Sequence, residues 1–415
     1  MLSEREKLDS LTGLGIELSQ INDLDILMER VLLRARQFAN ADAGSIYIRE
    51  GDLLNFTYTQ NDTLQRQLPK GEKLIYSTFQ VPIDEKSIAG YVAATGSALN
   101  IDDVYDLEPT LPYSFSKKFD ETVGYKTQSI LTIPLKNSRS QVMGILQIIN
   151  PQSEEGNITQ FSASDEKMMH HFAAVAAVAL ERAQMTRALI LRMIRMAEMR
   201  DPRETGAHVN RVAGVAVEIY EQWAMRRNMD EKEIDKTRDV LRMAAMLHDV
   251  GKVATSDLIL KKPARLNADE YEVMKQHTIQ GARLFQNRQS DFDEAAGVVA
   301  LSHHERWDGN GYPGYIDFNT GLPIKGFLQP NGQARGKKGT EIPLFGRIVA
   351  LADVFDALSS ERSYKEAWDE NTILAQIERS AGTHFDPELV EIFFSRYEII
   401  RAIHQRYKEK GDKSD

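Results

Sequence analysis

The sequence is organised around one stretch, His303-His304-Glu305-Arg306-Trp307-Asp308-Gly309-Asn310-Gly311-Tyr312-Pro313. Two adjacent imidazoles precede carboxylates and a glycine-rich turn, and imidazole is the commonest protein ligand for transition metals. Gly309 and Gly311 permit backbone angles that other residues avoid, and Pro313 fixes the exit of the turn. A His-His pair alone is weak evidence, because His170-His171 is another such pair that we interpret as helix surface. Further candidate metal ligands elsewhere in the chain are what make a metal site here a strong hypothesis.

Composition narrows the class of protein. The 415 residues suffice for two or three domains, and 42% hydrophobic with 27% charged residues is typical of globular proteins. No apolar run approaches the about 20 residues that span a bilayer, and the polar N-terminus does not resemble a secretory signal. We therefore predict a cytoplasmic protein with no membrane span. A net charge of -10 argues against non-specific nucleic-acid binding. Because there is no cysteine, any metal must bind to His, Asp or Glu.

The first half alternates between helical and strand periodicity. Helices are expected at residues 1–20, at Leu24–Phe38 and, briefly, at 87–93. Strands are expected in two pairs, at 44–49 with 53–58 and at 129–135 with 142–150. Helices that flank a central antiparallel sheet indicate an α+β sensor domain.

At this point the chain resembles a GAF domain over about residues 10 to 184. The matching segments are Ala41-Asp42-Ala43-Gly44-Ser45, Ser87-Ile88-Ala89-Gly90-Tyr91-Val92, Gly124-Tyr125-Lys126-Thr127-Gln128-Ser129-Ile130-Leu131 and Val142-Met143-Gly144-Ile145-Leu146-Gln147. The resemblance implies a sensor domain over residues 1–184 with an unknown small ligand. Phe119-Asp120-Glu121 is loosely similar to a motif of cyclic-nucleotide-binding GAF domains, but ordinary loop chemistry is the preferred interpretation. Without cysteine a covalent bilin is excluded.

A long helix is predicted over residues 164–199, as a link between sensor and effector. Two neighbouring apolar stripes follow it, Ala176, Leu180, Ala183, Ile190, Ile194 and Ala197, then Met185, Leu189, Met193 and Met196. Two stripes are too many for a lone surface helix, so we predict a parallel homodimer through this helix. The alternative is packing against the chain's own second domain.

The second half supplies candidate metal ligands in a set order. They are Glu204, His208, His248, Asp249, His277, His303, His304 and Asp353. Glu204 and His208 are four residues apart, on one helical face, and His277 falls in a helix expected over 268–285. A buried carboxylate is costly unless it is paired or metal-bound, so Asp249 and Asp353 beside apolar runs favour a metal. Eight ligands exceed what one zinc accepts and fit two or three ions. The other four histidines (His170, His171, His384, His404) are expected to be structural or exposed, without carboxylate partners.

These residues resemble the HD-GYP family of bacterial cyclic dinucleotide phosphodiesterases, over about residues 190 to 405. The matching segments are His208-Val209-Asn210-Arg211-Val212, His248-Asp249-Val250-Gly251-Lys252, Leu258 to Leu266, His303-His304-Glu305, Asp308 to Pro313 and Ala352-Asp353-Val354-Phe355-Asp356-Ala357-Leu358. The resemblance implies an all-α HD-superfamily domain over residues 190–415 that hydrolyses cyclic di-GMP. It also implies divalent ions, iron first and manganese as the alternative.

The resemblance assigns roles to the ligand positions. His208, His248, Asp249 and Asp353 would hold one metal. Asp249 would bridge to a second metal, held with His277, His303 and His304, while Glu204 would serve a third. A metal-activated hydroxide would then attack phosphorus, with Asp249 and Lys252 as catalytic residues. The expected substrate contacts are Lys252, Arg362, Lys365, Tyr312, Gly309 and Gly311, although Arg362 and Lys365 fit surface salt bridges equally well.

Two alternatives and one departure from the family pattern remain. The domain could be an HD hydrolase of another nucleotide or cyclic dinucleotide, or a non-catalytic receptor that docks a GGDEF-domain protein. The departure is the segment 316–341, which is longer than the usual family connection and rich in glycine and cations. We expect a flexible surface loop there, either a tolerated insertion, a cationic lid or a partner-docking loop.

Overall fold

A computed structural model describes residues 13–68, 79–198, 206–359 and 369–407. The chain divides into two compact units, Met1–Thr186 and Arg187–Asp415, and the division falls within helix α6 (Ala163–Glu198). None of the described helices combines the length and the apolar composition that a membrane crossing requires.

The first unit contains a single antiparallel sheet of six strands in the order β3-β2-β1-β6-β5-β4. The strands are β1 (Ala41–Glu50), β2 (Leu53–Asn61), β3 (Phe79–Pro82), β4 (Leu99–Ile101), β5 (Ile130–Lys136) and β6 (Val142–Pro151). The two strand pairs expected from the sequence are β1 with β2 and β5 with β6. The sequence did not predict the edge strands β3 and β4, which are only four and three residues long.

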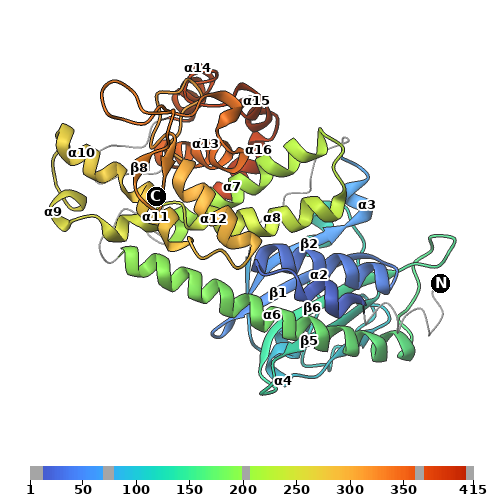
Figure 1. Cartoon of the computed structure of the whole chain (residues 1–415). Coiled ribbons are helices and arrows are strands. Elements are labelled where there is room, and N and C mark those ends of the chain that lie inside the picture. The colour runs from blue at the N-terminus through green and yellow to red at the C-terminus, as the bar shows by residue number, and fades with distance from the viewer. Residues whose placement is uncertain (1–12, 69–78, 199–205, 360–368, 408–415) are drawn as a thin grey trace. The chain divides into compact units, whose positions relative to one another are not determined.

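Helices cover both faces of this sheet (Figure 1). On one face α2 (Leu24–Phe38) and α6 share a core that includes Leu27, Leu146 and Phe172. On the other face α4 (Ile88–Thr95) packs against β1, β2 and β6. The short helices α3 (Asp62–Gln65) and α5 (Lys118–Val123) complete the unit. The predicted α+β architecture is thereby confirmed.

The two apolar stripes of α6 differ in exposure. Ala176, Leu180, Ile190 and Ile194 are buried within the chain's own two cores. The second stripe is exposed, with Met185 at 66%, Leu189 at 49%, Met193 at 42% and Met196 at 67%. Packing within the chain therefore accounts for the first stripe and leaves the second uncovered.

The described part of the second unit is almost entirely helical. Its helices are α7 (Gly206–Met225), α8 (Glu231–Met246), η1 (Val250–Ala254), α9 (Asp257–Leu260), α10 (Ala268–Lys275), α11 (His277–Leu284), α12 (Asp291–Ser302), η2 (Gly339–Glu341), α13 (Leu344–Ser359), α14 (Glu370–Arg379), α15 (Pro387–Ser395) and α16 (Tyr397–Arg406). One core that includes Val212, Leu247, Ile348 and Phe393 holds them together. The predicted helical second domain is confirmed.

Two local predictions for this unit were wrong. The helix expected over 268–285 is broken at Gln276 into α10 and α11, which lets His277 begin a new helix. The segment 316–341 is not a loop throughout. It contains the hairpin β7 (Ile316–Asp317) and β8 (Leu322–Pro323), and Tyr315 stacks on Phe327 with ring centroids 3.8 Å apart.

Glu305 explains why this inserted segment is held in place. Its buried carboxylate accepts hydrogen bonds from Gly314 N (2.6 Å) and Lys337 N (3.2 Å), one at each end of the segment. Arg283 of α11 donates to the carbonyls of Phe318 (2.6 Å) and Asn319 (3.2 Å). Hydrogen bonds to residues distant in sequence thus hold this segment, which has few apolar side chains to bury.

Candidate metal centre

Seven of the eight predicted ligands come together in the second unit, each at a helix end or on a buried helix face. His208 lies on α7, Asp353 on α13, and His248 and Asp249 lie between α8 and η1. His277 begins α11, and His303 and His304 follow α12. Five separate segments therefore meet at one place, which no local sequence pattern requires.

The seven side chains form two groups. His208, His248 and Asp353 make one group, and Asp249, His277, His303 and His304 make the other. Within each group the potential ligand atoms lie within 4.8 Å of one another.

Asp249 joins the two groups. Its Oδ1 lies 3.1 Å from His277 Nε2 and 3.6 Å from His303 Nε2, while its Oδ2 lies 3.3 Å from His248 Nε2. The second oxygen also accepts a hydrogen bond from Lys252 Nζ at 2.6 Å. This carboxylate has the placement of a bridging ligand.

The imidazoles are oriented from outside the cluster. The Nδ1 atom of His248 lies 2.9 Å from Ala245 O, that of His277 lies 2.7 Å from Met274 O, and that of His303 lies 3.1 Å from Val299 O. A carbonyl oxygen can only accept, so each Nδ1 carries the hydrogen and each Nε2 presents a lone pair to the cluster. Metal-bound histidines in proteins are held in this way.

The chemistry of these residues fits a bound cation. His277 Nε2 and His303 Nε2 are 3.5 Å apart, so two lone pairs face each other. Burial, outweighing the Asp249 carboxylate, lowers the pKa of His303; burial and the neighbouring imidazoles lower that of His304 well below its ordinary value. Neutral imidazoles cannot neutralise the Asp249 carboxylate, but they are good ligands. The donor set therefore fits divalent metal ions.

Asp249 remains ionised in this setting. Burial by itself would raise its pKa, but the ammonium of Lys252 holds the pKa of Asp249 well below its ordinary value. An ionised carboxylate that faces neutral imidazoles is ready to bind a cation.

Asp356 supports the first group from behind and was not predicted. It lies on α13, one turn after Asp353, and its Oδ2 is 2.8 Å from His208 Nδ1. Arg211 donates to both of its oxygens, and His404 Nε2 lies 3.3 Å from its Oδ1. The expectation that His404 has no carboxylate partner was therefore wrong. The spacing of Asp353 and Asp356 at i and i+3 was the available signal.

The glycines near the centre allow close backbone contact. A Cβ on Gly251 would lie 1.9 Å from His277 O and 2.4 Å from Gly281 N, so only glycine lets η1 approach α11. This contact sets His277 beside Asp249. A Cβ on Gly311 would lie 2.2 Å from Arg306 N, and Gly309 has a positive φ of 87°. Gly311 thus has a packing role and Gly309 a conformational one, and their contact with substrate stays a prediction.

Tyr312 lies against the ligands. Its ring stacks on His304 with centroids 4.8 Å apart and an interplanar angle of 27°. Three predicted site residues, Glu204, Arg362 and Lys365, lie outside the described residues, so their roles stay predictions.

The first unit offers two hollows that differ from this centre. One is a cavity of about 680 Å³ lined by residues that include Ser45, Phe56, Asp120 and Gln147. Asp120 there accepts hydrogen bonds from Tyr105 and Thr127, which supports the interpretation of this loop as ordinary structure. The cavity is large enough for a small ligand, and that ligand stays a prediction.

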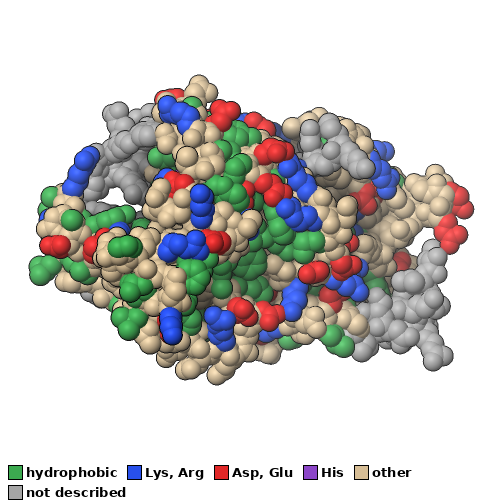
Figure 2. Space-filling model, turned by 45° about the horizontal axis from the view of Figure 1, so that its top comes forward, with side chains coloured by type: hydrophobic (Ala, Val, Ile, Leu, Met, Phe, Trp, Pro, Cys, Tyr) green, Lys and Arg blue, Asp and Glu red, His purple; other side chains and the backbone are tan. Residues whose placement is uncertain are grey.

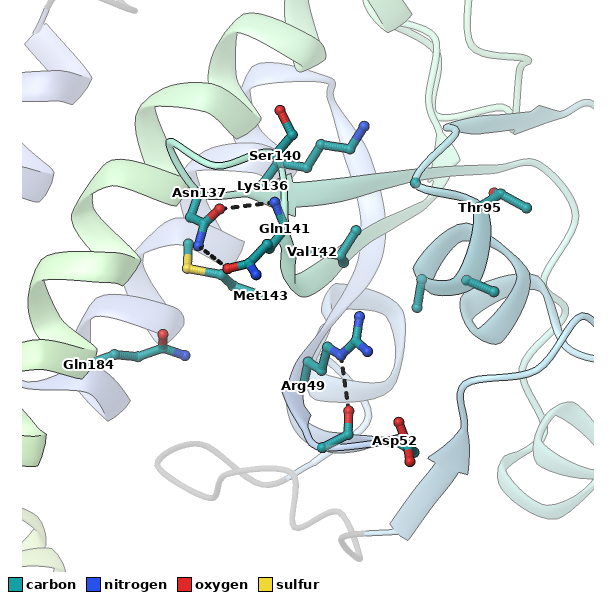
Figure 3. Close-up of a pocket in the computed structure, with 14 residues that line it drawn as sticks. Arg49, Asp52, Thr95, Lys136, Asn137, Ser140, Gln141, Val142, Met143 and Gln184 are labelled. Carbon is teal, nitrogen blue, oxygen red and sulfur yellow. Dashed lines mark hydrogen bonds between the residues drawn. The ribbon is translucent and has the colours of Figure 1, made fainter.

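The other hollow lies between two hairpin turns and has a volume of about 700 Å³ (Figure 3). Asn137 donates to Gln141 Oε1 at 3.1 Å and accepts from Gln141 N at 2.9 Å. Arg49 donates to Gly51 O at 2.9 Å. These side chains stabilise the turns, so we assign no binding role to them.

Comparison with known proteins agrees with this division. The GAF domain family matches residues 23–180, and the HD domain family matches residues 205–358 with a second match at 328–389. The chain carries a GAF domain followed by an HD domain. The predicted order of the two domains is confirmed. An HD domain implies divalent metal binding, and the two ligand groups lie within the matched HD segment.

Curated relatives match about half of this chain. A 3'3'-cGAMP-specific phosphodiesterase 2 of Vibrio cholerae is 38% identical over 48% of this chain and 33% of its own length. A cyclic di-GMP phosphodiesterase of Thermotoga maritima is 36% identical, over 52% and 50%. A cyclic di-GMP phosphodiesterase response regulator of Xanthomonas campestris is 39% identical, over 49% and 46%. The chain thus spans half or less of the length of these relatives.

Proposed function

We propose that the protein is a metal-dependent phosphodiesterase of the HD-GYP type that hydrolyses cyclic di-GMP. The observation that carries the proposal is the bridging placement of Asp249 between two groups of buried imidazoles. The names of the relatives support a cyclic dinucleotide as substrate.

The ligand groups indicate how many ions the centre would take and of what kind. We propose one ion in each group, with Asp249 shared, and a third if Glu204 also binds. Imidazole and carboxylate donors without thiolate suit iron or manganese. When bound, such ions supply an activated water and offset the charge on phosphate oxygens.

Residues around the ligands would bind the substrate and orient the ligand imidazoles. Lys252 places its ammonium beside the bridging carboxylate, where a phosphate oxygen of the substrate would also lie. Tyr312 would hold His304 in position through their stacked rings. Asp356 would fix the orientation of His208.

A second substrate has a specific observation in its favour. The 38% identical relative is named for 3'3'-cGAMP, so this dinucleotide belongs in the same experiment. Protein purified without oxygen and loaded with iron, or separately with manganese, is incubated with each dinucleotide. We expect conversion of cyclic di-GMP to the linear dinucleotide or GMP, and no conversion by an Asp249→Ala variant.

Two outcomes would overturn the proposal. Conversion of 3'3'-cGAMP alone would reassign the substrate. Tight binding of cyclic di-GMP without conversion by either metal-loaded form would make the domain a receptor.

We also propose that the GAF domain controls this activity through a parallel homodimer along α6. The support is the exposed stripe of Met185, Leu189, Met193 and Met196, which a second copy of the same helix would cover. Light scattering of a Leu189→Glu, Met193→Glu double variant should give a monomer mass where the unmodified chain gives a dimer. A monomeric unmodified chain would contradict this. The GAF ligand and a GGDEF-domain partner stay predictions.

A further inference from the structure

The helix α10 carries a tyrosine that core packing does not explain. None of the eight residues of α10 is buried, and 46% of Tyr271 is exposed. The start of the helix is fixed by a capping box between Asn267 and Glu270 and by the pairing of Glu270 with Lys262 at 2.6 Å. Hydrophobic side chains are visible on the surface in Figure 2 at the edge that α9 and α10 occupy in Figure 1. A large ring held on a helix with no buried residue calls for another explanation.

Tyr271 is connected to the metal centre by ring contacts. Its ring lies edge-to-face with Tyr312, with centroids 6.2 Å apart at 80°, and Tyr312 in turn stacks on His304. One face of Tyr312 is therefore covered by a ligand imidazole. Tyr271 is the outer ring of the series and the more exposed.

Lys275 places a positive charge beside the rings of Tyr271 and Tyr312. Its ammonium lies 5.0 Å from the Tyr271 ring centre and 5.5 Å from that of Tyr312. It also pairs with Glu272 at 2.6 Å, which holds it in place on the helix. A ring with an adjacent ammonium suits an anionic ligand that has an aromatic base.

We propose that Tyr271 stacks on a purine base of the substrate and so determines its affinity, with Lys275 beside the acceptor edge of the base. This inference rests on the proposed function, because a phosphodiester at the metal centre would direct the neighbouring base along the ring series. Guanine presents two acceptors on this edge, O6 and N7, whereas adenine presents N7 and an amino donor, so a lysine favours guanine.

The test compares four forms of the metal-loaded full chain, the unmodified protein and the variants Tyr271→Leu, Tyr271→Phe and Val273→Ala. Calorimetry gives the dissociation constant for cyclic di-GMP, and steady-state kinetics give KM and kcat. Tyr271→Leu should weaken binding and raise KM by about tenfold, or ~1.4 kcal/mol, with kcat within about twofold. Tyr271→Phe keeps the ring and should bind like the unmodified chain. Val273 is on the same helix and is 45% exposed, so Val273→Ala is the matched control.

The outcomes separate this inference from the proposed function. If cyclic di-GMP binds without turnover, the enzymatic proposal fails, and the dissociation constant of Tyr271→Leu still decides the stacking role. Equal affinity in Tyr271→Leu and the unmodified chain overturns the inference, as does an equal loss in Val273→Ala. Absence of any binding to the unmodified chain overturns both.

Discussion

Each of the two domains buries carboxylates, and their surroundings differ in kind. In the GAF domain Asp42 accepts hydrogen bonds from the hydroxyls of Thr63 and Tyr125, both at 2.9 Å. In the HD domain Asp249 faces imidazole Nε2 atoms whose partner nitrogens already carry the hydrogen. A buried carboxylate that accepts hydrogen bonds from neighbouring donors stabilises the fold and needs no ion. Asp249 faces lone pairs of neighbouring imidazoles and has Lys252 as its nearby cation, and this arrangement indicates a site for metal ions.

The largest expected effect comes from replacing the carboxylate that joins the two ligand groups. Asp249→Asn should lower metal content at both groups and reduce turnover by more than the 10–100-fold typical of supporting residues. Metal analysis and cyclic di-GMP hydrolysis measure this. Asp42→Asn is the matched buried control and should lower the unfolding temperature with metal content unchanged. Equal metal content in Asp249→Asn and the unmodified chain would break the comparison.

A smaller effect is expected behind the ligands. Asp356→Asn removes the charge that orients His208, so metal affinity in the first group should fall by about 10–100-fold. Competition with a metallochromic chelator measures this affinity. Asp386 is the control, because it is equally buried and pairs with Arg347, but it contacts no predicted ligand. An Asp386→Asn variant that lost metal to the same degree would show that Asp356 acts only through stability.

The smallest effect concerns a carboxylate of the HD domain that has its own partner. A hydrogen bond from Arg306 holds the pKa of Asp308 down at about 2. A lowered native pKa adds stability above the unfolded value near 4, and this stability is lost as the pH falls from about 4 to 2. Asp308→Asn should therefore cost less than about 1 kcal/mol at pH 7, because the pair is partly exposed, and only a small part of that at pH 2, where Asp308 is about half protonated. Denaturant unfolding of metal-free protein at both pH values checks this. A constant difference would refute the ionic origin.

Much of this molecule could be predicted from local patterns. The strand pairs of the GAF domain follow the alternation of Ile46, Ile48, Ile133 and Ile145 with neighbouring residues, and the ligand series follows spaced motifs. Short edge strands such as β4 were missed because three residues carry too little periodicity.

What the sequence could not predict depends on contacts between distant residues. The break at Gln276 interrupts a continuous helical pattern, and the close approach of Gly251 to His277 O on the far side of the break is a contact between distant residues. His404 meets Asp356 from a helix 48 positions later in the chain. The segment 316–341 is connected to Glu305, whose partners are two backbone amides that no side-chain pattern reveals.

The two backbone hydrogen bonds accepted by Glu305 have a practical consequence. Glu305 holds the backbone near both ends of the excursion, and Arg283 and Tyr315 hold Phe318, Asn319 and Phe327 within it, so the exposed turn at 330–333 is the part that lies clear of these contacts. A fluorescent reporter or an affinity epitope inserted at this turn would therefore leave the contacts of Glu305, Arg283 and Tyr315 in place.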